Sequence, residues 1–304
     1  MAARMPLMET FIGPLAALTA ALFWALATVL YSQAGSFLNA AQLNMVKGAV
    51  ACPLLVLGAW LTGNLLEFDG STAAWILLAS GVIGITIGDT LYFTALRRLG
   101  PWHTMLLEYL APPFAAVLAW LLLAEGMSWL EVTAASVTIM GILVVLSERR
   151  RQHAEPAAKI SISGVLAGTG AAFCQALGLV MSFHALASFE VSPVSAALLR
   201  LFAGTVALTV ALLLLKPSII GATRSALRHT SIPWLLTAIV MGTFLAIWLQ
   251  QIAIAYINPG VAQTLLATAP LWLVPIQWLR GQPLSGRALL GAVIALGGIA
   301  MLFN

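Results

Sequence analysis

The sequence has 304 residues, of which 61% are hydrophobic and 8% charged, and its formal net charge is +4. Soluble domains carry about 25% charged residues, so this chain has too few polar side chains to cover a water-facing surface. Its basic residues are scattered among short polar segments and not interleaved with aromatic residues, which argues against a nucleic-acid partner. The composition therefore predicts an all-α membrane protein whose main solvent is lipid.

Apolar segments long enough to cross about 30 Å of hydrocarbon follow one another along the whole chain. They lack a period of two, and unpaired backbone groups cannot face lipid, so helices are expected. The first segment is too long for a cleaved signal peptide and lacks a small-residue cleavage pattern. We predict ten transmembrane helices, near residues 11–32, 43–62, 74–96, 102–123, 129–147, 163–183, 194–215, 232–255, 260–279 and 286–303.

The two halves of the chain share a weak internal repeat. Matches of proline and tryptophan at one spacing carry more weight than matches of alanine or leucine, which are frequent by chance. We predict a first five-helix repeat over 1–147, a cytoplasmic linker over 148–162 and a second five-helix repeat over 163–304. An odd number of spans inverts the second repeat in the membrane. The matches are Gly84 with Gly242, Pro101 with Pro259, Pro112 with Pro270 and Trp120 with Trp278 at a shift of 158, Gly13 with Gly164 at 151, and Lys47 with Arg200 at 153.

The positions of lysine and arginine predict the orientation of the chain. Connections between spans 1 and 2, 3 and 4, 5 and 6, 7 and 8, and 9 and 10 share one face, which carries nearly all of these residues; the opposite face carries only Arg4. The positive-inside rule therefore places the linker in the cytoplasm and both termini outside. The basic residues of the first face are Arg97, Arg98, Arg149, Arg150, Arg151, Lys159, Lys216, Arg224, Arg228, Arg280 and Arg287.

Three stretches of the sequence resemble a known family. They are Gly88 to Leu99 (GDTLYFTALRRL), Glu108 to Phe114 (EYLAPPF) and Trp120 to Ser128 (WLLLAEGMS), and the run from Ile252 to Pro275 looks like the same module. The chain is similar to EamA-type members of the drug/metabolite transporter superfamily. The resemblance implies ten helices in inverted repeats, a central cavity and alternating access for small compounds, usually outward. The first-helix glutamate of the related small multidrug resistance proteins is replaced here by Trp24 and Gln175.

Four ionisable residues lie inside predicted spans: Lys47, Asp89, Glu108 and Arg200. Each costs roughly 2.5–3.5 kcal/mol to insert, so each should face the bundle interior or water. The sequence permits a cluster of Lys47 with Asp89 or Glu108. These carboxylates could carry protons or bind a cationic group, or form a static buried ion pair. Arg200 could bind a substrate carboxylate or extend to the outer interface.

Aromatic and uncharged polar residues add further candidates for substrate contact. Aromatic rings favour flat or cationic ligands, whereas amides can bond either a polar substrate or a neighbouring helix. Repeat-related prolines allow kinks that could act as gates or fix a static shape. The aromatic candidates are Trp24, Tyr92, Tyr109, Trp248 and Trp272; the amide candidates are Gln175, Gln251 and Gln263; and the gating candidates are Pro112 and Pro270.

These observations favour a secondary transporter in a bacterial-type inner membrane, exporting amino-acid-like or aromatic and cationic metabolites by alternating access. The expected partners are a small-molecule substrate, membrane lipid and protons as a coupling ion. No catalytic residue, metal or cofactor is expected, because the histidines are isolated and no HExxH motif or phosphate-binding loop occurs. A membrane-embedded enzyme and a non-transporting assembly protein are the alternatives, and the oligomeric state is left open.

Overall fold

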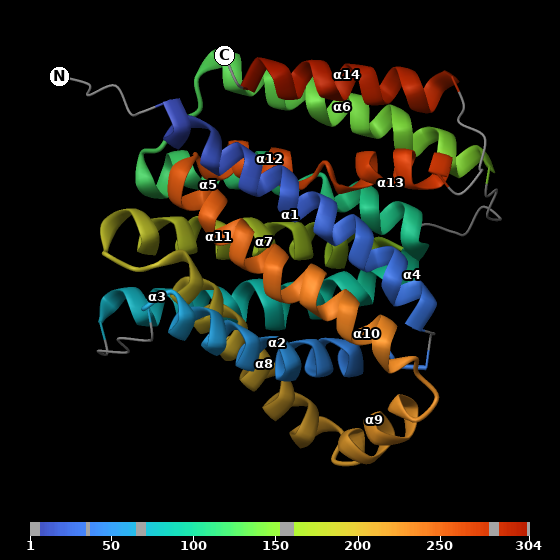
Figure 1. The fold of residues 1–304 in the computed structure, drawn as a ribbon. Helices are drawn as coiled ribbons and strands as arrows, with labels where there is room; N and C mark the ends of the chain where they lie inside the picture. The colour runs from blue at the N-terminus through green and yellow to red at the C-terminus, as the bar shows by residue number, and fades with distance from the viewer. Residues whose placement is uncertain (1–6, 35–36, 65–70, 153–160, 280–285, 303–304) are drawn as a thin grey trace.

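The computed structural model describes residues 7–34, 37–64, 71–152, 161–279 and 286–302, and all regular structure within them is helical (Figure 1). The α-helices are α1 (Leu7–Ala34), α2 (Ala40–Leu61), α3 (Thr72–Gly81), α4 (Asp89–Glu108), α5 (Ala111–Leu123), α6 (Trp129–Gln152), α7 (Ile162–Ser188), α8 (Pro193–Leu215), α9 (Ile219–Leu227), α10 (Ile232–Ile239), α11 (Ala246–Tyr256), α12 (Pro259–Leu266), α13 (Ala269–Leu279) and α14 (Gly286–Leu302). Two π-helical segments, η1 (Val82–Gly88) and η2 (Val240–Leu245), join α3 to α4 and α10 to α11.

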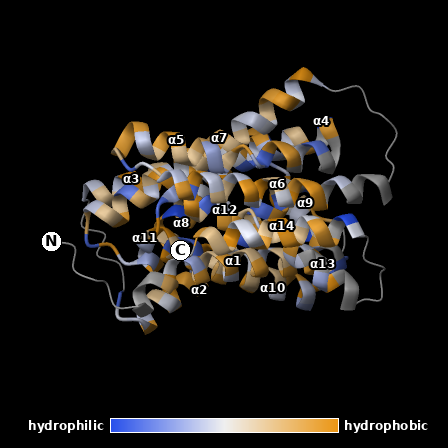
Figure 2. Cartoon of the chain, turned by 90° about the horizontal axis from the view of Figure 1, so that it is seen from above, coloured by the Kyte–Doolittle hydropathy of each residue, from blue (hydrophilic) through white to orange (hydrophobic). Residues whose placement is uncertain are grey.

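Most of the helices have the length and composition of membrane spans. Seven described helical segments are long and apolar enough to cross a bilayer, and Trp129–Val145 and Leu289–Leu302 are shorter apolar helices. Hydrophobic residues predominate along the helices in Figure 2. Large apolar side chains such as Trp129, Leu214 and Leu166 are 88%, 77% and 68% exposed. Such a surface is stable only against lipid.

The helices have two ends, which define two faces of the bundle. We call the end where α1 begins and α14 finishes the terminal face, and the end that carries α9 and the start of α7 the linker face (Figure 1). At the linker face, the backbone N–H of Ser231 donates to the carbonyl of Ala34 at 3.0 Å. At the terminal face, the hydroxyl of Ser195 donates to the carbonyl of Asn64 at 3.0 Å.

The two halves of the chain make equivalent contacts. A Cβ built on Gly13 would lie 2.8 Å from Ile257, and one built on Gly164 would lie 2.7 Å from Leu99. Gly164 and Leu99 are the repeat mates of Gly13 and Ile257, at shifts of 151 and 158. α1 therefore packs on α11 as α7 packs on α4. The halves share unusual backbone as well, because η1 and η2 begin at Val82 and Val240, also 158 residues apart.

The antiparallel pair α6 and α14 is built on glycine. A Cβ on Gly141 would lie 2.4 Å from the backbone nitrogen of Ala295, and one on Gly298 would lie 2.6 Å from that of Thr138. Gly298 and Ala295 are the repeat mates of Gly141 and Thr138 at a shift of 157, so the two contacts are equivalent. In lipid, helices associate through such close van der Waals contact, which small residues permit.

The connection between the third and fourth predicted spans differs from expectation. Residues 97–101 were expected to separate two helices, yet α4 is helical throughout. Ala95 and Leu107 both approach Gly168, at 3.4 and 3.1 Å from a Cβ built there. In a straight helix they would be about 18 Å apart, so α4 turns back on itself. Pro101 lies in the turn, where its missing N–H and its ring favour a sharp bend.

The fourth and ninth predicted spans are broken helices. α4 ends at Glu108 and α5 begins at Ala111, and 158 residues later α12 ends at Leu266 and α13 begins at Ala269. Pro112 and Pro270 are thus the second residues of new helices, where a backbone donor has no partner inside the helix. At each of these positions two residues interrupt the α-helix, and in the second interruption the carbonyl of Ala267 accepts a hydrogen bond from Tyr109.

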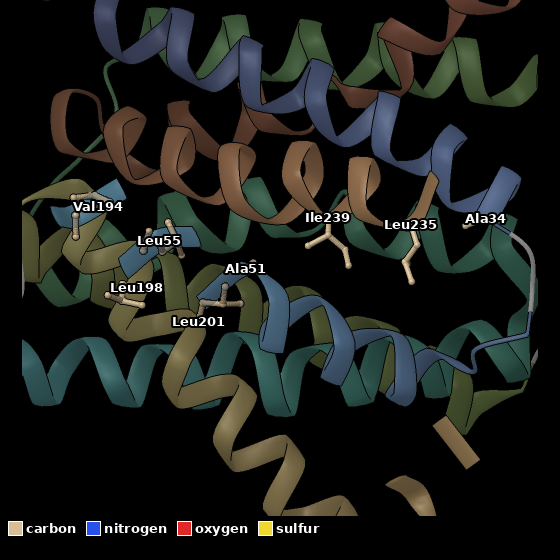
Figure 3. Close-up of a cluster of buried hydrophobic side chains, with 10 residues drawn as sticks. Ala34, Ala51, Leu55, Val194, Leu198, Leu201, Leu235 and Ile239 are labelled. Atoms are coloured by element: carbon tan, nitrogen blue, oxygen red, sulfur yellow. The ribbon is translucent and has the colours of Figure 1, made fainter. Parts of the chain in front are cut away.

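A hydrophobic cluster joins the first repeat to the second (Figure 3). Leu55 from α2 packs with Val194, Leu198 and Leu201 from α8, while Ile239 from α10 packs beside them. Leu55 and Ile239 are fully buried. The cluster ties α8 to α2 and so fixes the position of the α8 residues that follow Leu198.

Gly298→Ala is expected to lower the melting temperature of the purified protein, because the new methyl group would overlap the α6 backbone. Gly297→Ala is the matched control, since nothing lies within 4 Å of a Cβ there. Alanine favours a helix more than glycine does, so the control should hold or raise the melting temperature. Equal melting temperatures for the two variants would contradict the close α6–α14 contact.

Candidate functional site

A cavity of about 520 Å³ lies between the two repeats. Its walls come from α1, α2 and α4 in the first repeat and from α7, α8, η2, α11, α12 and α13 in the second. The volume suits a small organic molecule. The charged residues at its wall are Lys47, Asp89, Glu108 and Arg200.

Asp89 is held by side chains from both repeats. Asn44 Nδ2 on α2 donates to one carboxylate oxygen at 2.8 Å, and Gln175 Nε2 on α7 donates to the other at 3.3 Å. Lys47 lies one helical turn after Asn44, close enough for its charge and that of Asp89 to attract each other. Asp89 is the first residue of α4, directly after η1. The carboxylate is thus fixed by two amides and compensated by one cation.

Glu108 and two tyrosines form the wall beside Asp89. Glu108 is the last residue of α4, its side chain is accessible, and its negative charge repels that of Asp89. The Tyr92 hydroxyl is close enough to both carboxylates to feel their charges. The Tyr109 hydroxyl donates across the repeats to the carbonyl of Ala267 at 3.4 Å. This wall gives the cavity an acidic, aromatic side suited to a cationic or hydrogen-bond-donating group.

Arg200 borders the same cavity from α8 but has a different environment. Its side chain is only 4% exposed, and among the described residues its Nε and Nη1 atoms have no hydrogen-bond partner. Burial is the dominant influence on its guanidinium, and within the described residues no carboxylate acts on its charge. A buried cation in this state is costly, because desolvation is not offset by a counter-charge.

Trp24 forms another wall of the cavity and links the repeats. Its indole Nε1 donates to the carbonyl of Gly242 at 2.8 Å. Gly242 lies in η2, and a Cβ there would meet Ala27 at 2.4 Å. A hydrogen bond to the opposite repeat therefore holds the ring at the cavity wall. In the part of the chain that the structure describes, no group of three or more His, Cys, Asp or Glu residues could hold a metal ion.

Comparison with known proteins identifies the family to which this architecture belongs. The sequence profile of the EamA-like transporter family matches residues 11–147 and again residues 162–304. The chain belongs to the EamA-like transporter family. A solved structure, described only as the crystal structure of a protein, superposes with a TM-score of 0.74 at 19% sequence identity, over 97% of this chain and 96% of that one. This likeness concerns the fold alone. The comparison with curated proteins gave no match.

Membership of the family makes this chain an integral membrane protein of a transporter family, in two repeats, as its composition and resemblance indicated. Most of the predicted contact residues of this EamA-like transporter line the cavity: Trp24, Lys47, Asp89, Tyr92, Glu108, Tyr109, Gln175, Arg200, Gln263 and the predicted gate residue Pro270. Their roles in binding and gating remain predictions.

Trp248, Gln251, Trp272 and Pro112 do not border the cavity. Trp248 packs on Phe244 with ring centroids 5.8 Å apart, against the hydrophobic cluster around Leu55. Gln251 is fully buried and accepts a hydrogen bond from Ser182 of α7. Sequence position within an apolar span does not reveal which face of the helix turns inward, so these residues could not be separated from the cavity wall.

The cavity of this EamA-like transporter also has residues that the sequence reasoning missed. Asn44 is the most important, because it bonds Asp89 directly; Tyr31, Thr205 and Thr243 line the wall as well. A signal for Asn44 existed, since it lies one helical turn before Lys47 and so shares its face. The threonines carried no such signal, because their hydroxyls commonly bond the backbone of their own helix. Tyr31 carried none either, because an aromatic residue near a span end is equally typical of the membrane interface.

Asp89→Asn is expected to lower the melting temperature for two reasons. It removes the counter-charge of Lys47, and it replaces one carboxylate oxygen, which accepts a hydrogen bond, with an NH₂ group that faces an amide donor. Adding Lys47→Gln should recover much of the loss by removing the uncompensated cation. Thermal unfolding in detergent measures both effects. A double variant that is less stable than Asp89→Asn would contradict the compensation of Lys47 by Asp89.

Proposed function

We propose that this protein is a secondary transporter that exports small metabolites by alternating access, with ten spans in two inverted five-helix repeats. The observation that carries the proposal is the charged cavity between the repeats, bordered by helices broken at equivalent positions. Transporters built from repeats place their substrate sites at the repeat interface, often at discontinuous helices. The described helices supply ten apolar crossings if α3 with η1 and the start of α4, the end of α4 with α5, α10 with η2 and α11, and α12 with α13 each form one.

The cavity is sealed toward the terminal face. Beyond it, Ser182 bonds Gln251 across the repeats, and Leu179, Ile254 and Ala262 form a buried cluster. At the same end, α12 packs on α5, where a Cβ on Gly260 would meet Ala116 at 2.9 Å.

Several of the lining residues lie toward the linker face instead. Tyr31 is near the end of α1, Asn44 near the start of α2, and Ala171 in the first part of α7. This arrangement supports a state loaded from the linker face, and the Lys/Arg bias makes that face cytoplasmic. Loading from the cytoplasm fits export from a bacterial-type inner membrane.

A fluorescent protein or alkaline phosphatase fused after Asn304 tests the orientation. An inverted repeat with a cytoplasmic linker puts the C-terminus outside, so the phosphatase fusion should be active and the fluorescent fusion dark. A fusion inside the linker, after His153, is the matched control and should give the opposite pattern. A fluorescent C-terminal fusion would contradict the orientation or the span number.

The proposed substrates are amino-acid-like or aromatic and cationic metabolites. The cavity size, the aromatic wall of Trp24, Tyr92 and Tyr109, and the paired carboxylates support this class. Asp89 and Glu108 are the proposed proton carriers, because two neighbouring carboxylates that repel each other readily share a proton. Alternating protonation at this pair would couple substrate release to proton entry.

Glu108→Gln should abolish the dependence of transport on a pH gradient, because the amide cannot carry a proton. The measurement is uptake of labelled substrate into proteoliposomes with and without an imposed gradient, together with counterflow, which needs no gradient. Glu190→Gln, at an exposed position between α7 and α8, is the matched control and should behave as wild type. Unchanged gradient dependence in Glu108→Gln would remove this residue from the coupling mechanism.

A further inference from the structure

The position of Arg200 is set by backbone contact. α8 lies so close to the end of α3 that a Cβ on Gly81 would be 2.1 Å from the Arg200 carbonyl oxygen. Thr86 donates to the carbonyl of Gly204 at 2.9 Å, one turn further along α8. The Arg200 Nη2 atom lies 3.6 Å from a Cβ built on Gly84. Gly81 and Gly204 thus hold α8 close to the end of α3, and the guanidinium lies beside Gly84, between the repeats.

The repeat identifies what is missing around this guanidinium. Lys47 is the mate of Arg200, and its acid Asp89 corresponds to Ile247. The two amides that hold Asp89 are also replaced: Asn44 corresponds to Ala197, and Gln175 corresponds to Trp24. The first repeat therefore supplies a cation with an acid and two donors. The second repeat supplies a cation without an acid or an amide at the corresponding positions.

Two static explanations for Arg200 do not fit its surroundings. An arginine that extends to the membrane interface keeps its head in water, yet this side chain is 4% exposed. An arginine that fixes helix packing has protein acceptors, yet the described residues give none to the Nε and Nη1 atoms, which carry three of the five N–H donors of the group. These residues therefore supply no partner at those two atoms that would offset the cost of the buried charge.

We propose that Arg200 is the subsite for an anionic oxygen group of the transported molecule. This group would compensate the charge of Arg200 as Asp89 compensates the charge of Lys47. A carboxylate is the best match, because a planar guanidinium binds it through two parallel hydrogen bonds. The inference rests on the proposed transport function and narrows it. The substrate carries an anionic group at Arg200 and can offer a cationic or donor group to the Asp89 and Glu108 wall.

Three probes that differ in one group each test this subsite: L-phenylalanine, L-phenylalaninamide, which lacks the carboxylate, and 3-phenylpropionate, which lacks the amine. Binding to the purified protein is measured by calorimetry. We expect the wild type to bind a carboxylate probe at least about tenfold more tightly than the amide. Arg200→Gln should bring the ratio close to one. Arg228→Gln, which removes an exposed cation after α9, should keep it.

Ile247→Asp is the sharper variant, because it rebuilds in the second repeat the acid that Asp89 provides in the first. The new carboxylate should compete with the ligand for Arg200 and lower affinity for the carboxylate probes, whereas Ile247→Asn changes polarity and size equally without adding charge. Carboxylate probes should therefore bind Ile247→Asp more weakly than Ile247→Asn. This comparison holds even if Arg200→Gln does not fold.

Several results would overturn the subsite. They are equal binding of carboxylate and amide probes by the wild type, no binding of either carboxylate probe, a preference that persists in Arg200→Gln, or equal carboxylate binding by the two Ile247 variants. Transport assays in proteoliposomes separate this failure from failure of the carrier. Uptake of the amide without a carboxylate preference retains the carrier and removes the subsite. Arg200-dependent binding without any uptake retains the subsite and removes the carrier.

Discussion

The contact between α8 and the end of α3 is the constraint on which the charged cavity depends. Gly81 and Gly204 bring the two backbones together, and Thr86 adds a hydrogen bond to a glycine carbonyl. Lipid offers no hydrophobic force between helices, so such contacts must hold the halves together. The same contact fixes the positions of Arg200 and Asp89 on different parts of the cavity wall. A larger residue at Gly81 would move both charges at once.

Symmetry of the backbone is combined with asymmetry of the side chains. Contacts such as Gly13 with Ile257 and Gly164 with Leu99 repeat closely, and so do the helix breaks before Ala111 and Ala269. The acidic residues of the cavity do not repeat, since Asp89 and Glu108 correspond to Ile247 and Leu266. Packing that must let two halves fit together tolerates little change, whereas the wall of a cavity can become different on its two sides. In the proposed transporter, the difference would give the substrate one way to lie in the site.

Much of this organisation could be predicted from the sequence, for identifiable reasons. A charged fraction of 8% leaves few alternatives to lipid, and the prolines at one fixed spacing indicate the repeat. The intramembrane charged residues line the cavity because a charged side chain exposed to lipid is energetically costly. Trp248 and Trp272 do not line the cavity, because an aromatic ring is equally stable when it packs against apolar side chains. Pro101 marks the bend within α4, whereas the two π-helical segments have no residue signature, since they depend on how backbone bonds are shared.

The η1 segment influences the direction in which the Asp89 side chain leaves its helix. Each residue of an α-helix advances the side-chain direction by about 100°, and a π-helical stretch accommodates an extra residue without ending the helix. Asp89 follows that stretch directly. Shortening η1 by one residue would turn Asp89 by roughly a quarter of the circumference, away from Asn44 and Gln175, although every chemical group of the site remained. In the proposed substrate site, the length of a helix would therefore be a determinant of specificity in its own right, independent of the identity of the side chains that it carries.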